Sequence, residues 1–178
     1  MSVGYVREKY LDIVKPFIGK DIIKVITGQR RVGKTTILKQ IIALIEKEEQ
    51  NPNVIYINKE EHDFKHIKTN EDLYEYIKPK LVESKNNFVF IDEIQEVKDF
   101  EIALRQLLVE GIDLYCTGSN AKMLSGDLAT HLSGRYIEVY VSSLSYKEFL
   151  DVHQLENSNE SLNKYIRYGG MPYLMHLP

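Results

Sequence analysis

The sequence has no tryptophan and only one cysteine, Cys116. A single cysteine cannot form a disulfide within the chain, which is typical of proteins from a reducing compartment. We therefore expect a cytoplasmic protein. Cys116 is expected to pack as a small buried apolar residue.

Long apolar runs and an excess of basic charge are also missing. The longest apolar runs have the length of a strand, as at residues 88–91, so no membrane-spanning segment is expected. The first twenty residues mix charged and apolar types and lack the continuous apolar stretch of a secretory signal. Because 26 acidic residues outnumber 23 Lys and Arg, the net charge is −3, and any contact with nucleic acid would need a local basic patch.

What the chain does contain is an alternation of short β-rich runs and helical patterns. This alternation predicts an α/β fold, in which helices flank a mostly parallel sheet. The predicted strands cover residues 22–27, 54–57, 88–91, 112–117 and 136–141. The predicted helices cover approximately residues 5–17, 34–48, 70–81, 100–109, 121–132, 145–152 and 162–168. Pro79 disfavours the second half of the helix at 70–81.

The pattern changes after the fifth predicted strand. Ser145-Tyr-Lys-Glu148 has the spacing of a capping box, which starts a helix. We expect residues 1–143 to form the core and residues 144–178 to form a helical segment. Regular structure is predicted to stop at Gly169-Gly-Met-Pro172, and the end of the chain at Pro178 leads us to expect a further C-terminal domain.

Residues 28–35 match the pattern G-x-x-x-x-G-K-[ST] of a phosphate-binding loop, between a predicted strand and a predicted helix. The glycines let backbone N–H groups turn inward toward phosphate oxygens, and the following helix adds its positive end. Lys34 is expected to contact the outer phosphates, and Thr35 to ligate Mg²⁺. Arg30 and Arg31 are either exposed charges or attract a polyphosphate or a DNA backbone. The predicted nucleotide-binding residues are Gly28, Gln29, Arg30, Arg31, Val32, Gly33, Lys34, Thr35 and Thr36.

Two carboxylates, Asp92 and Glu93, end the apolar run at 88–91. Parallel sheets bind ligands beyond the carboxyl ends of their strands, so Asp92 is expected beside the phosphate loop, holding Mg²⁺ through water. Glu93 is expected to deprotonate an attacking water. An Asp-Glu pair alone is usually a solvated surface pair. Because no Asn-Lys-x-Asp follows a late strand, we expect ATP or ADP rather than GTP.

The fourth predicted strand ends in small polar residues, Thr117-Gly-Ser-Asn120. In an ATPase with strand order 5-1-4-3-2, this strand lies between the phosphate loop and the acidic pair. Ser119 is therefore a candidate contact for the γ-phosphate or the attacking water, with Asn120 or Thr117 as substitutes. The alternative is that these residues cap a helix.

His62 and His66 are four residues apart, and on a helix they would share a face as zinc-binding pairs do. No third ligand is apparent in the sequence, and the surrounding segment has the composition of a polar connection. No zinc site is therefore predicted there.

Taken together, the sequence resembles the AAA+-related bacterial and archaeal P-loop ATPases whose second half is a domain of unknown function. The stretches that carry this resemblance are residues 26–36, 90–95, 117–119, 132–135, 144–149 and 169–172. The resemblance implies a three-layer α/β/α ATPase fold with a five-stranded sheet in the order 5-1-4-3-2. It also implies that Arg135 occupies an arginine-finger-like position, which would act in a neighbouring subunit of a homo-oligomer. The alternative for Arg135 is a structural salt bridge.

The resemblance leaves several functions open. Relatives continue past this chain into a C-terminal region, and the lid that covers the nucleotide would then be mostly absent here. The first hypothesis is an ATPase coupled to a C-terminal effector domain. The others are a nucleotide-gated switch with little turnover, a DNA-associated ATPase similar to replication initiators, and a small-molecule kinase as the second enzyme class.

Overall fold

The computed structural model describes residues 5–119 and 132–172, and its centre is a five-stranded sheet. All neighbouring strands are parallel, in the order β2-β3-β4-β1-β5. This is the predicted order 5-1-4-3-2 read from the other edge, so the prediction is confirmed. The strands are β1 (Ile23–Gly28), β2 (Asn53–Asn58), β3 (Asn87–Asp92), β4 (Asp113–Thr117) and β5 (Tyr136–Val141).

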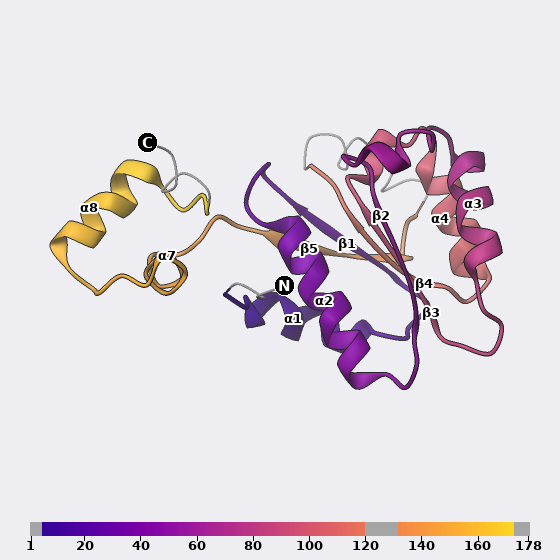
Figure 1. Ribbon diagram of the computed structural model, residues 1–178, viewed down its shortest axis with the longest axis horizontal. Helices are drawn as coiled ribbons and strands as arrows, with labels where there is room; N and C mark the ends of the chain where they lie inside the picture. The colour runs from indigo at the N-terminus through magenta and orange to yellow at the C-terminus, as the bar shows by residue number, and fades with distance from the viewer. Residues whose placement is uncertain (1–4, 120–131, 173–178) are drawn as a thin grey trace.

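Helices cover both faces of this sheet (Figure 1). Apolar side chains of α1 (Glu8–Val14) and α2 (Lys34–Glu48) pack on one face, around Phe90 and Tyr115. Those of α3 (Asn70–Ile77) and α4 (Phe100–Val109) pack on the other. Both faces of β1, β3 and β4 are therefore buried, which explains the continuous apolar run of β3 and confirms the three-layer α/β/α architecture.

Several observed helices differ from the predicted ones in length or position, and prolines explain two of these differences. Pro79 has no N–H to donate and disfavours helix in the residue before it, so α3 ends at Ile77 and a 3₁₀ helix follows at Lys78–Lys80. Pro16 similarly lies in a 3₁₀ helix (Lys15–Phe17) after α1, which is shorter than the predicted 5–17. Two further 3₁₀ helices, His62–Phe64 and Ile94–Glu96, were not predicted. The helix predicted at 121–132 lies outside the described residues except at its last position.

Two helices follow β5 and extend away from the sheet (Figure 1): α7 (Tyr146–His153) and α8 (Asn159–Tyr168). The predicted capping box is present, because Ser145 Oγ accepts from Glu148 N at 3.3 Å and Ser145 N donates to the Glu148 carboxylate at 2.8 Å. The second helix begins three residues earlier than predicted. Ser158 is its N-cap and accepts a hydrogen bond from Ser161 N at 3.2 Å. Within residues 5–119 and 132–172, no helix is both long and apolar enough to cross a bilayer.

The chain returns from α8 to the start of the helical segment at Leu144. Leu144 N donates to Gly170 O at 2.6 Å, and Tyr165 Oη donates to Leu144 O at 2.9 Å. The backbones approach so closely that a Cβ at position 170 would lie 2.2 Å from Leu144 O. This contact holds α7 and α8 as a pair and brings Pro172 back toward the core.

Replacing Gly170 by Ala should therefore loosen this helical pair. Overpacking at a close backbone approach costs about 1–3 kcal/mol, so the amides of α8 should exchange with solvent about 5- to 150-fold faster in Gly170→Ala. Hydrogen exchange read by mass spectrometry measures this. Asn163→Ala, on the exposed side of α8, is the control. Equal exchange in the two variants would contradict the assigned contact.

Candidate nucleotide-binding site

The loop that joins β1 to α2 carries the predicted phosphate-binding residues. Gly28 has φ +144° and Gly33 has φ +100°, which glycine adopts far more readily than other residues. A Cβ on Gly28 would also lie 2.4 Å from Val141 O, so β5 can pack here only against a glycine. Gly33 is the N-cap of α2, so the loop ends at the positive end of a 15-residue helix.

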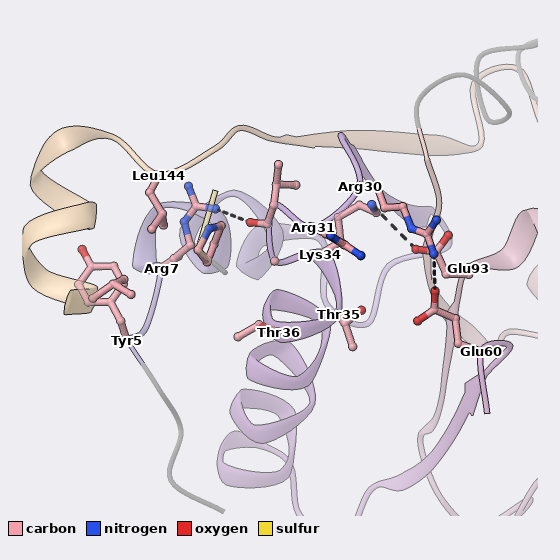
Figure 2. Close-up of a pocket in the computed structure, with 14 residues that line it drawn as sticks. Tyr5, Arg7, Arg30, Arg31, Lys34, Thr35, Thr36, Glu60, Glu93 and Leu144 are labelled. Carbon is pink, nitrogen blue, oxygen red and sulfur yellow. Dashed lines mark hydrogen bonds and ion pairs between the residues drawn. The ribbon is translucent and has the colours of Figure 1, made fainter. Parts of the chain in front are cut away.

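Lys34 connects this loop to the end of β3. Its side chain is only 4% exposed, and Nζ donates to Gly28 O at 3.3 Å and to Gln29 O at 3.2 Å. The same Nζ lies 3.9 Å from Glu93 Oε1. Figure 2 marks this ion pair with a dashed line. The loop and the acidic pair therefore meet at one edge of the sheet, as predicted from the parallel strands.

Asp92 is buried at this edge and is oriented by two hydroxyl groups. Thr117 Oγ1 donates to Asp92 Oδ1 and accepts from Glu93 N at 3.0 Å. Tyr56 Oη lies 3.5 Å from Asp92 Oδ2, and burial together with the Asp92 charge raises the pKa of Tyr56. Tyr56 was missed from the sequence, because it lies within a strand pattern typical of core residues.

Glu93 has an unusual backbone conformation, with φ +57°. Non-glycine residues in this region cost energy, and they cluster at functional sites. The Gln95 amide nitrogen donates to Glu93 Oε2, while the Gln95 Oε1 atom is buried without a hydrogen-bond partner in the described part of the chain. Glu93 is thus held between Lys34 and Gln95 at the rim of the loop.

A cavity of about 650 Å³ opens over the loop, within the size range of small-molecule sites. Figure 2 shows the polar side of this cavity, which is formed by loop residues and the carboxylates of Glu60 and Glu93. The same cavity is also lined by Tyr5, Arg7, Leu144, Val152 and Pro172, and Figure 2 shows Tyr5, Arg7 and Leu144 on the other side of Thr36 from Glu93. These residues were not predicted from the sequence, because they come from opposite ends of the chain and no motif connects them.

Of the predicted catalytic residues that the structure describes, Ser119 and Arg135 do not line the cavity. Ser119 follows the end of β4 by two residues, and Arg135 precedes β5. Arg135 O accepts from Ile23 N at 2.9 Å, so Arg135 lies at the start of β1 and β5, at the opposite edge of the sheet from Gly28. Arg30 does line the cavity, and its exposed side chain lies 3.7 Å from Glu60. Asn120 lies outside the described residues.

The histidine pair does not form the arrangement considered from the sequence. His62 lies in a 3₁₀ helix that ends at Phe64, so His66 does not share a helix face with it. Within residues 5–119 and 132–172, no group of three or more His, Cys, Asp or Glu side chains is placed to hold a metal ion. A magnesium ion held by two protein ligands and phosphate oxygens does not require such a group.

Comparison with known proteins identifies relatives of this chain. The family model described as "AAA domain" matches residues 20–150. An uncharacterized protein of Haemophilus influenzae is 38% identical over an alignment of 173 residues, which covers 93% of this chain and 43% of that protein. An uncharacterized protein of Methanocaldococcus jannaschii is 37% identical over an alignment of 161 residues, which covers 84% of this chain and 35% of that protein. The chain thus spans less than half the length of these curated relatives.

Solved structures share the fold at low sequence identity. AMPPCP-bound DnaA from Aquifex aeolicus superposes with a TM-score of 0.64 at 17% identity, covering 99% of this chain and 61% of that one. Hsp104 of S. cerevisiae, in a complex with casein, gives 0.62 at 15% identity, covering 93% and 31%. The Aeropyrum pernix ORC1 protein in complex with DNA gives 0.55 at 12% identity, covering 89% and 49%.

Proposed function

Because this chain belongs to the AAA domain family, a group of AAA+-related P-loop ATPase domains, we propose that it binds ATP with Mg²⁺ and hydrolyses it. The observation that carries the proposal is the 3.9 Å separation between Lys34 Nζ and Glu93 Oε1. This separation supports the proposal, because the ammonium proposed to bind phosphate and the carboxylate proposed as general base line one cavity.

The phosphates are proposed to bind in the loop of residues 28–36. Its backbone N–H groups and the N-terminal end of α2 favour negative charge. Lys34 Nζ now donates to the carbonyls of Gly28 and Gln29, and phosphate oxygens would replace these acceptors. Lys34 is almost fully buried, so its charge acts through a weakly screened environment.

The residues present fit a magnesium ion. The Thr35 hydroxyl lines the cavity, and the Asp92 carboxylate lies buried at the same edge of the sheet, held by Thr117 and Tyr56. Oxygen donors of this kind suit Mg²⁺, which retains waters and binds phosphate oxygens as well. Bound Mg²⁺ would neutralise charge on the phosphates.

Glu93 is proposed as the general base. A water attacks the γ-phosphorus, the bond to the β–γ bridging oxygen breaks, and Glu93 accepts the proton of the water, which yields ADP and phosphate. Gln95 and the positive φ at Glu93 keep the carboxylate at the cavity rim. Thr117, whose hydroxyl contacts Asp92, is favoured over Ser119 as the polar contact from β4.

The residues that line the cavity away from the phosphate loop suit the base of the nucleotide. Tyr5, Leu144, Val152 and Pro172 provide an aromatic ring and apolar surface for a flat purine. The preference for adenine over guanine rests on the missing Asn-Lys-x-Asp pattern.

Calorimetric titration with ATP, ADP and GTP, with and without Mg²⁺, tests this function. We expect ATP and ADP to bind, GTP to bind more weakly, and Mg²⁺ to strengthen ATP binding. In Asp92→Asn the strengthening by Mg²⁺ should fall by about tenfold or more, while Mg²⁺-free binding changes little. Absence of binding by any nucleotide would refute the proposal, and an unchanged Mg²⁺ effect in Asp92→Asn would remove Asp92 from the metal site.

Coupling to a C-terminal effector domain is also part of the proposal, and the curated relatives are more than twice as long as the region that aligns with this chain. Arg135 lies too far along the sheet to serve this chain's own cavity, so an arginine-finger role would require a neighbouring subunit. We do not propose nucleic-acid binding here, because the likeness to DnaA and ORC1 concerns the fold alone.

A further inference from the structure

Arg7, in the segment before α1, is fixed against the helix that follows the phosphate loop. Its backbone N–H donates to Gln40 Oε1 at 3.3 Å, and Gln40 Nε2 donates to Tyr5 O at 3.0 Å. Gln40 is a buried residue of α2. The backbone of residues 5–7 is therefore held in place relative to α2 and to the loop from which α2 begins.

The Arg7 side chain joins three segments that are far apart in the sequence. It is 7% exposed, and its guanidinium donates to Val32 O of the phosphate loop at 3.3 Å and to Ser142 O after β5 at 3.1 Å. Nε donates to Glu148 Oε1 of α7 at 2.8 Å, and the guanidinium lies over the Tyr10 ring. Since all three nitrogens already have acceptors, Arg7 is not free to bind a phosphate itself.

Glu148, the acceptor for the Arg7 guanidinium, lies in the first turn of α7. Its Oε2 atom accepts from Ser145 N at 2.8 Å, which closes the capping box, and from Arg7 at 3.3 Å. Burial opposes ionisation of the carboxyl, but the hydrogen bonds from Arg7 and Ser145 outweigh it and hold the pKa of Glu148 below its usual range. One carboxylate therefore fixes both the start of α7 and the position of Arg7.

Apart from the Arg7–Glu148 ion pair, the described part of the chain shows few contacts between the α7–α8 pair and the core. In Figure 1, α7 and α8 lie apart from the sheet, joined to it by the segment after β5. Figure 2 shows Arg7 between Leu144 and the loop, with Tyr5 beside α7. Tyr5 Oη donates to Asp151 of α7 at 3.3 Å, and Leu144 and Val152 line the same cavity as the loop.

We propose that Arg7 is a positioning residue that couples the phosphate loop to α7, so that phosphate bound in the loop stabilises the position of the α7–α8 pair. The proposal rests on nucleotide binding at residues 28–36. It adds a coupling between the loop and α7 that the phosphate-loop motif does not imply. Phosphate in the loop fixes the Val32 carbonyl; this fixes the Arg7 guanidinium, and Arg7 fixes Glu148 at the start of α7. As a result α7, which lines the cavity through Val152, and α8, which is paired with it, move away from the loop less often.

Inorganic tripolyphosphate with Mg²⁺ separates this coupling from direct contact with the base. It occupies the loop but has no base to touch Leu144 or Val152. We expect tripolyphosphate at saturation to slow hydrogen exchange of the α7 amides at least about fivefold in the wild-type chain, the lower end of typical coupling between sites. ATP should slow it at least as much.

Two substitutions break the pair in different ways. In Glu148→Gln the capping box is retained, because glutamine also serves at this position, but the ion pair is lost. In Arg7→Lys the charge is retained, but one ammonium cannot reach Val32, Ser142 and Glu148 together. In both variants, saturating tripolyphosphate should slow hydrogen exchange of the α7 amides less than about twofold, because the coupling is lost. Glu156→Gln, an exposed carboxylate between the two helices, should respond as the wild type does.

The outcomes distinguish this inference from the proposed function. If the wild-type chain binds tripolyphosphate and α7 exchange does not change, or if Glu148→Gln and Arg7→Lys respond like the wild type, the coupling is refuted while nucleotide binding stands. If the wild-type chain binds neither ATP nor tripolyphosphate, the proposed function fails and the coupling with it.

Discussion

Replacing Lys34 by Ala should weaken ATP binding at least about 100-fold. Two hydrogen bonds from an ammonium group to phosphate oxygens contribute about 3–6 kcal/mol together, which corresponds to a factor of about 150 to 25,000. The burial of Lys34 favours the upper part of this range, because water screens the interaction little. Calorimetric titration with ATP and Mg²⁺ measures the loss.

The matched control for this variant is Lys47→Ala. Lys47 is an exposed residue in the last turn of the same helix, so the variant loses one positive charge about 20 Å from the loop. It should bind ATP as the wild type does. If Lys34→Ala kept ATP affinity within a few-fold of that control, Lys34 would not contact the phosphates, and the site would have to be sought in another part of the cavity.

The core of the fold could be predicted from the sequence because its signals are local. Val89, Phe90 and Ile91 form an uninterrupted apolar run, as expected of a strand buried on both faces. The glycines at 28 and 33 occur where the observed φ angles disfavour other residues. The adjacency of Lys34 and Glu93 then follows from the geometry of parallel strands, whose carboxyl ends share one edge.

What the sequence could not reveal depends on contacts between distant segments. The capping box at Ser145 and Glu148 was predicted, but the second partner of Glu148 is Arg7, 141 residues away. Tyr56 likewise has the pattern of a core strand residue and becomes a neighbour of Asp92 only once β2 pairs with β3. The N-cap at Ser158, by contrast, is a local signal, and it corrects the start predicted for α8.

Arg135 illustrates a different limit. A motif can assign a residue to a family position without saying which molecule that residue serves. In this structure Arg135 lies at the start of β5, while the loop begins at the end of β1, beside Val141. Its proposed role therefore stays a prediction about an assembly.

Replacing Glu93 by Gln should reduce ATP turnover to background while ATP still binds. Glutamine has the shape of glutamate but cannot accept the proton of the attacking water, and loss of a general base costs about 10²- to 10⁴-fold in rate. Binding should be unchanged or stronger, because the variant removes a negative charge that now lies 3.9 Å from Lys34. Release of inorganic phosphate under saturating ATP and Mg²⁺ measures turnover, and calorimetry on the same sample measures binding.

Asp99→Asn provides the matched control for Glu93→Gln. Asp99 also follows β3, has a positive φ of 53° and loses one carboxylate, but its side chain is half exposed and lies 3.9 Å from Lys98. Turnover by Asp99→Asn should equal that of the wild type. If Glu93→Gln turned over ATP as fast as this control, Glu93 would not be the base. If the wild-type chain bound ATP without releasing phosphate, the nucleotide-gated switch would replace hydrolysis as the function, and Glu93 would then serve only to hold Lys34 in place before nucleotide binds.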